Sequence, residues 1–186
     1  GSGPGAIVRG WGPAGMMGGW NDAPQAGPAI SIDQARQEAQ AYLDRLGNGD
    51  LTLDEVMEFQ DNFYAIVKEK STGIGAFEVL INKQTGAVFP EIGPNMMWNT
   101  KYGMMGSGSP MGRAMGYQQP TGPMTVSADQ AKQDAQRWLD ANQPGSTTET
   151  PDQFSGYYTL HILKDGQVTG MLSVNGYSGQ IWYHTW

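Results

Sequence analysis

Two stretches of the chain decide the fold, and they are near copies of each other. The first reads Ser31-Ile-Asp-Gln-Ala-Arg-Gln-Glu-Ala-Gln-Ala-Tyr-Leu-Asp44, and the second reads Ser127-Ala-Asp-Gln-Ala-Lys-Gln-Asp-Ala-Gln-Arg-Trp-Leu-Asp140. Nine of the 14 positions are identical. Each stretch opens with a serine followed three residues later by a glutamine, which is the spacing of a capping box, and alanines then recur at helical spacing. Each therefore predicts a helix, and the pair indicates a tandem duplication.

Strand patterns follow each predicted helix. Residues 63–68 and 157–164 are rich in aromatic and β-branched side chains and alternate in polarity. Asp165 and Gly166 are typical of a two-residue hairpin turn. Further strands are expected at residues 77–81, 87–89, 167–174 and 180–183. We therefore predict an α+β protein of two repeated units, each with one helix packed on a small antiparallel sheet of three to four strands.

Glycine marks the boundaries of these units. Of the 27 glycines, nine lie in residues 1–29 and seven in residues 93–123. Glycine loses more backbone entropy on ordering than any other residue, so neither stretch favours long helices or strands. The predicted organisation is an N-terminal tail (1–29), a first unit (30–92), a linker (93–123) and a second unit (124–186). Because the chain stops within an aromatic strand pattern, we also expect the natural precursor to extend beyond Trp186.

Composition excludes several classes of function. The chain has no cysteine, so it cannot form a disulfide framework or a thiolate metal site. Its formal net charge of −7 argues against sequence-independent nucleic-acid binding. No apolar run approaches the roughly 20 residues of a membrane-spanning helix.

A repeated motif resembles the PepSY domain family. After each helix and hairpin, the chain carries a strand and turn of the form apolar-x-apolar-Asn-x-x-Ser/Thr-Gly-x-apolar. The motif stands here as Ile81-Asn82-Lys-Gln-Thr85-Gly86-Ala-Val88 and as Val174-Asn175-Gly-Tyr-Ser178-Gly179-Gln-Ile181. The helix openings, Asp33-Gln34-Ala35 and Asp129-Gln130-Ala131, are also similar to that family. Both copies depart from many members by carrying Asn instead of Asp at the turn.

The resemblance implies a small, non-catalytic module. PepSY domains occur in peptidase propeptides and in secreted or membrane-associated proteins, and the family has no shared catalytic residue to transfer to this chain. We therefore expect no enzymatic activity, and a location outside the cytoplasm of a prokaryote (secreted, cell surface or periplasmic). A peptidase-inhibitor-like role is an alternative that rests on this resemblance alone.

Methionines gather in the two glycine-rich stretches. A thioether is a soft ligand suited to Cu(I), so a copper-handling function is one hypothesis, with His184 as a further ligand. The same side chains could instead fill irregular gaps, or form contacts between subunits. Apart from Cu(I), no cofactor is expected. The candidate metal ligands are Met16, Met17, Met96, Met97, Met104, Met105, Met111, Met115 and His184.

Aromatic residues accompany these methionines, although disordered chains are usually depleted in them. We therefore expect both stretches to lie on a protein surface, either of this molecule or of a neighbour, and Ile7 and Val8 to add a strand to an open sheet edge. The leading hypothesis is a protein-interaction or self-assembly module, with filament formation as one outcome. Its partner would be another protein or further copies of the chain. The candidate contact residues are Ile7, Val8, Trp11, Trp20, Trp98, Tyr102 and Tyr117.

The remaining polar patterns favour no catalytic site. His161 alternates with Leu160 and Ile162, which predicts a surface or interface position on the opposite face of its strand. The acidic segment 44–55 does not fit a calcium-binding EF-hand loop and is interpreted as a solvated loop. The two histidines, at 161 and 184, show no nucleophile or zinc spacing.

Overall fold

The computed structural model describes residues 28–104, 111, 114, 116 and 119–186. Helix α1 (Ile32–Leu46) begins at the predicted capping box, where Ser31 Oγ accepts a hydrogen bond from the backbone N–H of Gln34 at 3.2 Å. It ends at Gly47, whose φ of 65° is the left-handed conformation that favours glycine. Helix α4 (Ala128–Asn142) begins at Ser127 with the same serine cap. Both predicted helices are therefore confirmed.

Strands follow each helix in sequence. The N-terminal half continues with β1 (Leu51–Glu58), β2 (Asn62–Glu69), β3 (Gly75–Asn82) and β4 (Val88–Pro90). After the short helix α2 (Pro94–Met97) and helix α4, the C-terminal half continues with β5 (Thr147–Thr148), β6 (Asp152–Phe154), β7 (Tyr157–Lys164), β8 (Gln167–Asn175) and β9 (Ile181–Tyr183). Strand β1 was missed by the sequence analysis, because three acidic residues interrupt its apolar pattern.

The prediction of two separate helix-on-sheet units is wrong. The strands of both halves form one mixed, nine-stranded sheet in the order β1-β2-β3-β6-β7-β8-β9, with β4 paired to β3 and β5 paired to β7. Strands β3 and β6 run parallel and join the halves, whereas the other pairs are antiparallel.

Glycine at position 75 makes this junction possible. Gly75 pairs with Phe154 across the two strands. A Cβ atom added at Gly75 would lie only 2.5 Å from ring carbons of Phe154, closer than real Cβ contacts allow. The phenylalanine ring therefore occupies the space that any other side chain at position 75 would need, and this contact cannot be read from the alternation of apolar residues.

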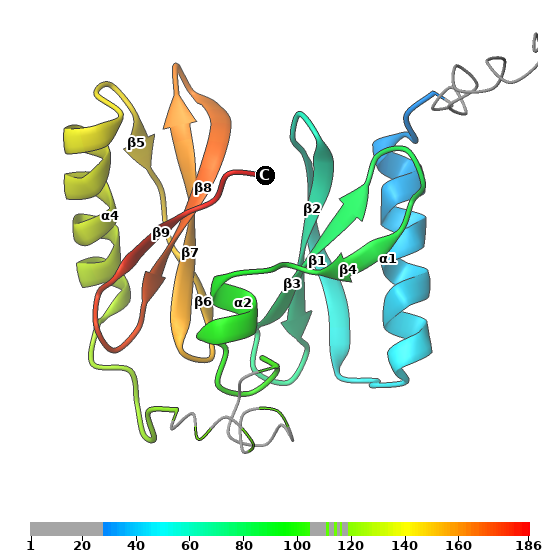
Figure 1. The fold of residues 1–186 in the computed structure, drawn as a ribbon, viewed down its shortest axis with the longest axis horizontal. Helices are drawn as coiled ribbons and strands as arrows, with labels where there is room; N and C mark the ends of the chain where they lie inside the picture. The colour runs from blue at the N-terminus through cyan, green and yellow to red at the C-terminus, as the bar shows by residue number, and fades with distance from the viewer. Residues whose placement is uncertain (1–27, 105–110, 112–113, 115, 117–118) are drawn as a thin grey trace, which may run out of the picture.

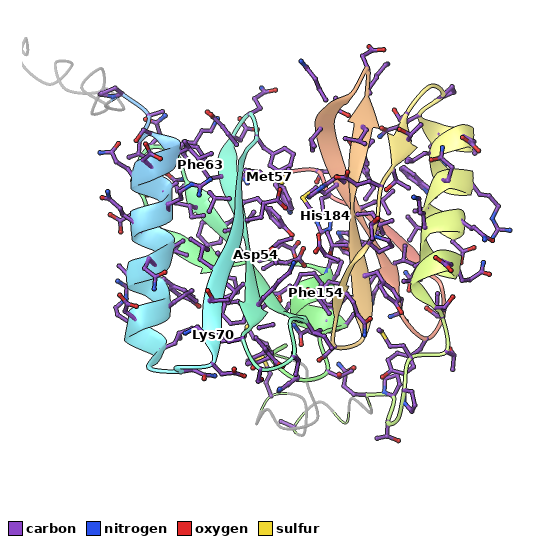
Figure 2. All side chains as sticks on the ribbon, turned by 180° about the vertical axis from the view of Figure 1, so that it is seen from behind. Asp54, Met57, Phe63, Lys70, Phe154 and His184 are labelled. Carbon is purple, nitrogen blue, oxygen red and sulfur yellow. The ribbon has the colours of Figure 1, made fainter. Side chains whose placement is uncertain are left out.

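The sheet is covered on both faces. Figure 1 shows α1 and α4 at the two outer sides of the molecule, with the strands of both halves between them. One face of β2 packs under α1 through Phe63, Ala65 and Val67. Alternate residues of the same strands point the other way, into a central cluster that we call the seam, which Figure 2 shows filled with side chains. The seam consists of Tyr64, Ile66, Leu80, Trp98, Phe154, Tyr157 and Met171.

The repeated turn motif has the same hydrogen bonds in both halves. Asn82 Oδ1 accepts from the backbone N–H groups of Gln84 and Thr85, each at 2.9 Å. In the second copy Asn175 Oδ1 accepts from the equivalent backbone groups two and three residues later, at 2.9 and 3.0 Å. The glycine that ends the turn in each copy, Gly86 and Gly179, has a positive φ, of 70° and 73°. The side-chain oxygen thus replaces a backbone acceptor in the turn.

Side chains that follow β4 form hydrogen bonds with backbone groups of β3. Asn95 Oδ1 accepts from the backbone N–H of Glu78 at 3.2 Å, and Asn99 Nδ2 donates to the carbonyl of Ala76 at 2.7 Å. These two side chains occupy the stretch of the β3 edge between β4 and β6. The first part of the glycine-rich segment 93–123 is therefore packed against the sheet.

Gly156, in the turn between β6 and β7, provides a test of the packing. Its φ is 107°, and an added Cβ would overlap the carbonyl oxygen of Trp98. We expect Gly156→Ala to lower the free energy of unfolding by at least about 2 kcal/mol, measured by urea denaturation. Gly166→Ala is the control, because Gly166 also has a positive φ (78°) but open space around it, and should cost about 1 kcal/mol. Equal losses in the two variants would contradict this packing.

Candidate functional site

A buried carboxylate lies at the centre of the seam. Glu78, on β3, is completely buried. Its Oε1 accepts hydrogen bonds from the hydroxyl groups of Tyr64 and of Thr159, the latter at 3.0 Å, and its Oε2 accepts from the hydroxyl of Tyr157 at 2.6 Å. Tyr64 comes from the N-terminal half and the other two donors from β7. The carboxylate therefore bonds the two halves together.

The hydrogen-bond chain continues to a histidine that lies beside a second carboxylate. Thr159 Oγ1 lies 3.0 Å from Ser173 Oγ, which lies 2.9 Å from His184 Nε2. His184 Nδ1 lies 3.2 Å from Oε1 of Glu91. Serine, histidine and carboxylate thus follow one another in the order of a hydrolytic triad. Ser173 and Glu91 are fully buried and His184 is 4% exposed, so the serine hydroxyl has no contact with solvent in this structure.

Burial dominates the pKa values of Glu78 and its two tyrosine partners. Burial raises the pKa of Glu78 above its usual value, and the nearby Glu91 adds to the rise against the opposing effects of His184, Tyr157 and Tyr64. Burial and then the Glu78 charge hold the pKa values of Tyr64 and Tyr157 well above the usual range. Both tyrosines therefore keep their protons and act as hydrogen-bond donors.

A substitution at Glu78 should reveal the raised pKa of its carboxyl group. A raised carboxyl pKa means that the folded state holds the proton more tightly than the unfolded chain, so the stabilisation is present below the unfolded pKa of about 4.3 and is lost as the pH rises through the raised value. Glu78→Gln keeps the size but does not titrate. We expect the stability of the wild type relative to Glu78→Gln to fall between pH 4 and pH 8, measured by urea unfolding. The fall should be about 1.4 kcal/mol for each tenfold difference in proton affinity between the folded and unfolded states.

The control for that series is Glu58→Gln, since the Glu58 side chain is 58% exposed and lies outside the seam. Glu58→Gln should follow the wild-type pH profile closely. Parallel profiles for the wild type and Glu78→Gln would show that the Glu78 pKa is not raised.

A second polar cluster joins the two halves elsewhere. Glu55 on β1, Asp152 on β6 and His161 on β7 place their ligand atoms within 4.8 Å of one another. His161 Nδ1 lies 2.6 Å from Oε1 of Glu149. Burial lowers the pKa of His161, but the carboxylates of Glu55 and Glu149 outweigh it and raise the pKa to about 9. Of the polar groups described, this set is the one with the composition of a metal site.

The edge of the sheet at β4 is bordered by a small groove. A cavity of about 200 Å³ is lined by Tyr42 and Leu46 of α1, Phe77 of β3 and Pro90 of β4, together with Asn95 and Tyr102. Leu46 is 47% exposed, and Ile92, just beyond β4, is 66% exposed. Among the described residues β4 pairs with β3 alone, so one edge of β4 has no strand beside it.

Comparison with known proteins adds a weak structural likeness. No family model matches the chain, and no curated protein matches it. Among solved structures, the C-terminal domain of YpeB from Bacillus megaterium matches with a TM-score of 0.30 and 11% sequence identity, over 83% of this chain and 62% of that chain. The chain thus spans about three-fifths of that domain, and the PepSY similarity stays a prediction from the repeated motif. Within the described residues no helix is long and apolar enough to cross a membrane.

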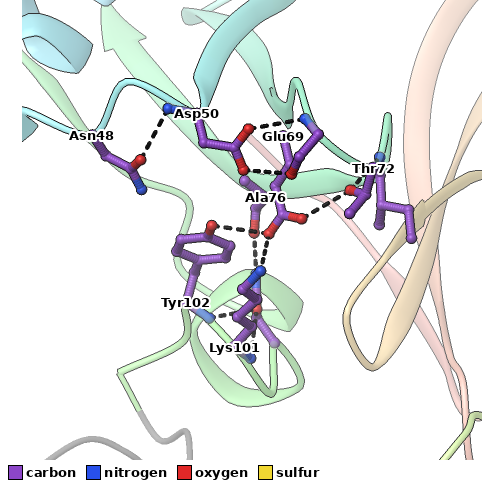
Figure 3. Close-up of polar contacts among 10 residues, drawn as sticks. Asn48, Asp50, Glu69, Thr72, Ala76, Lys101 and Tyr102 are labelled. Atoms are coloured by element: carbon purple, nitrogen blue, oxygen red, sulfur yellow. Dashed lines mark hydrogen bonds and ion pairs between the residues drawn. The ribbon is translucent and has the colours of Figure 1, made fainter.

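The candidate contact residues that the structure describes are packed within the molecule. Trp98 is 9% exposed and meets Trp182 edge to face in the seam, with ring centroids 6.2 Å apart. The Tyr102 hydroxyl donates to Glu69 Oε1 at 2.9 Å, and Lys101 Nζ approaches the same oxygen at 2.5 Å (Figure 3). The other five, Ile7, Val8, Trp11, Trp20 and Tyr117, lie outside the described residues.

The candidate copper ligands are placed in different surroundings. Met97 packs against the seam, and its neighbour Met96 is half-buried on the same short helix. Met104 and Met111 are exposed, whereas His184 is buried between Ser173 and Glu91. Met16, Met17, Met105 and Met115 lie outside the described residues, so the copper hypothesis stays a prediction.

Sequence reasoning missed the acidic residues that meet in the seam. Glu78 is a single charge inside the apolar run Phe77–Ile81, and that interruption was the available signal. Glu55 was assigned to a solvated loop, but it lies on β1 beside His161. His161 was expected at a surface or interface, and the structure places it at the interface between the halves.

Proposed function

We propose that this protein is a non-catalytic, extracytoplasmic interaction module that assembles with further copies of itself by strand addition at β4. The observation that carries this proposal is the unpaired edge of β4 beside an apolar groove. The PepSY-like turn motifs support the non-catalytic and extracytoplasmic parts. The burial of Ser173 also supports a binding function, because its hydroxyl, in the triad-like order, has no contact with solvent in this structure.

The register of β4 leaves backbone groups for a further strand. The carbonyl of Ala87 accepts from Asn82 N–H at 2.9 Å, and Glu91 N–H donates to the Glu78 carbonyl at 3.0 Å. Because bonding alternates along an antiparallel pair, the N–H and C=O of Val88 point away from β3. Pro90 has no N–H and limits the ladder at that end. The edge of β4 can therefore pair with only a short strand.

The segment that fits is residues 6–9 of a second copy. Ala6, Ile7 and Val8 form a short apolar run of the length that β4 offers, and Ile7 and Val8 favour strands. Paired alongside β4, this segment would lie next to Pro90, which lines the groove together with Leu46. The 27 residues before Pro28 span up to about 90 Å when extended, which is ample to reach a neighbouring molecule.

Analytical ultracentrifugation of the full chain tests the assembly. We expect the chain to form oligomers as its concentration is raised to about 100 µM. A Kd near 10 µM, or an association free energy of about −7 kcal/mol, would give this behaviour. The double variant Ile7→Asp/Val8→Asp should be monomeric, because a carboxylate at either position would be buried against the groove without a partner. Leu46→Glu, at an exposed position that lines the groove, should have the same effect.

The matched control is Val168→Glu. Val168 is 39% exposed on β8, in the other half of the molecule, so the same change in charge should leave the oligomers intact. A wild-type chain that stays monomeric would overturn the proposal. So would oligomers that persist in both the tail and the groove variants, since they would be held together elsewhere.

A further inference from the structure

We propose that Glu55, Asp152 and His161 form a binding site for a divalent transition-metal cation that fastens the two halves together, with Glu149 as a positioning residue. The site shares no residue with the candidate methionine ligands for Cu(I). It is also independent of the assembly at β4, because none of its residues borders that groove.

The first support is the convergence of three strands. Glu55 belongs to β1 of the N-terminal half, at a point where the register with β2 shifts, whereas the other two ligands belong to β6 and β7. The distance from Glu55 Oε2 to His161 Nε2 is 3.4 Å. That is the separation of two tetrahedral ligands held about 2.1 Å from one zinc ion. The three ligand atoms lie within 4.8 Å of one another, so carboxylate rotation alone can bring the third oxygen into range.

The second support is an unpartnered nitrogen. His161 is 8% exposed, and its Nε2 has no hydrogen-bond partner among the described residues. Its Nδ1 faces Glu149 Oε1 at 2.6 Å. Because Glu55 and Glu149 favour the protonated ring, a metal ion binds by displacing the proton of Nε2, while Nδ1 keeps its proton toward Glu149. Nε2 then presents its lone pair toward Glu55 and Asp152. This carboxylate–histidine–metal arrangement is the usual one for metal-binding histidines.

The charges around the cluster also favour a cation. Asp54, Glu55, Glu149 and Asp152 carry four negative charges when ionised. Lys68 is one nearby counter-charge, with its Nζ 2.8 Å from Asp54 Oδ2 and 3.2 Å from Asp152 Oδ1. Protonated His161 is another, and it loses its positive charge when Nε2 binds a metal ion. The lysine can keep its closer contact with Asp54 while Asp152 turns to a cation. The excess of negative charge raises the local concentration of cations.

The ligand set defines the class of cation, and the exposed side of the cluster lets the cation enter from solvent. One imidazole and two carboxylates suit Zn²⁺ and similar transition metals, whereas Ca²⁺ takes six to eight oxygen ligands. The side chains of Glu55 and Glu149 are 40% and 49% exposed, so the cluster opens to solvent on that side. Water can therefore complete a tetrahedral shell around three protein ligands.

The full chain is first stripped of metal with EDTA. It is then titrated with Zn²⁺, measured by calorimetry, and separately with Co²⁺, measured by visible absorption. We expect one Zn²⁺ per chain, and a Tm that rises with zinc concentration because the cation binds the folded state alone. Glu55→Gln and Asp152→Asn should each weaken Zn²⁺ binding at least 100-fold. Glu149→Gln should weaken it by about 10- to 100-fold with the Co²⁺ band shape retained, which marks a positioning residue.

The matched control is Glu58→Gln, since Glu58 lies on the same strand as Glu55 but pairs with Lys83. It should bind zinc as the wild type does. Because Glu55 is partly exposed, Glu55→Gln should fold, and circular dichroism will confirm that before titration. Zinc binding that is absent, or unchanged in the Glu55 and Asp152 variants, would overturn the proposal. Tighter binding of Ca²⁺ than of Zn²⁺ would overturn the assignment of the cation class.

Discussion

Glu78 accepts hydrogen bonds from hydroxyl groups of both halves, and the packing of the seam depends on those bonds being made. Each half has a helix over one face of its strands, so the second face must be buried by the other half. A carboxylate there would be costly without partners, since a buried polar group left without hydrogen bonds costs about 1–3 kcal/mol, and a charged one more. The three hydroxyl donors offset that cost, and they fix how β3 and β7 face each other.

The joining of the halves also explains why the sequence predicted local structure better than the whole fold. The serine caps, the Asp165–Gly166 turn and the two Asn turns are set by neighbouring residues, and the structure has all of them. The single sheet depends instead on Gly75 and Phe154, which lie far apart in the chain. A glycine in a strand pattern gives no hint of which distant ring will occupy its space.

The same reasoning applies to the candidate site. Alternation along 157–164 placed His161 on the face opposite Leu160, and that face is the one that meets the N-terminal half. The contact of His161 with Glu55 could not be predicted, because the acidic residues of 51–58 obscured the strand pattern of β1. The positions of Glu55 and Glu58, facing solvent or the interface, can be inferred only once β1 is known to pair with β2. Polar residues on edge strands are thus the hardest to assign from periodicity alone.

The order of Ser173, His184 and Glu91 shows why geometry alone does not define a site. A nucleophile must meet its substrate, and Ser173 is enclosed by Thr159 on one side and His184 on the other. The indole of Trp186 lies against the imidazole of His184, with ring centroids 4.9 Å apart, and also stacks on Tyr64. Opening that network would expose two carboxylates and the apolar seam together, so it serves cohesion. The groups that stay accessible in the two proposed binding regions lie instead at the edge of β4 and at the open side of the Glu55 cluster.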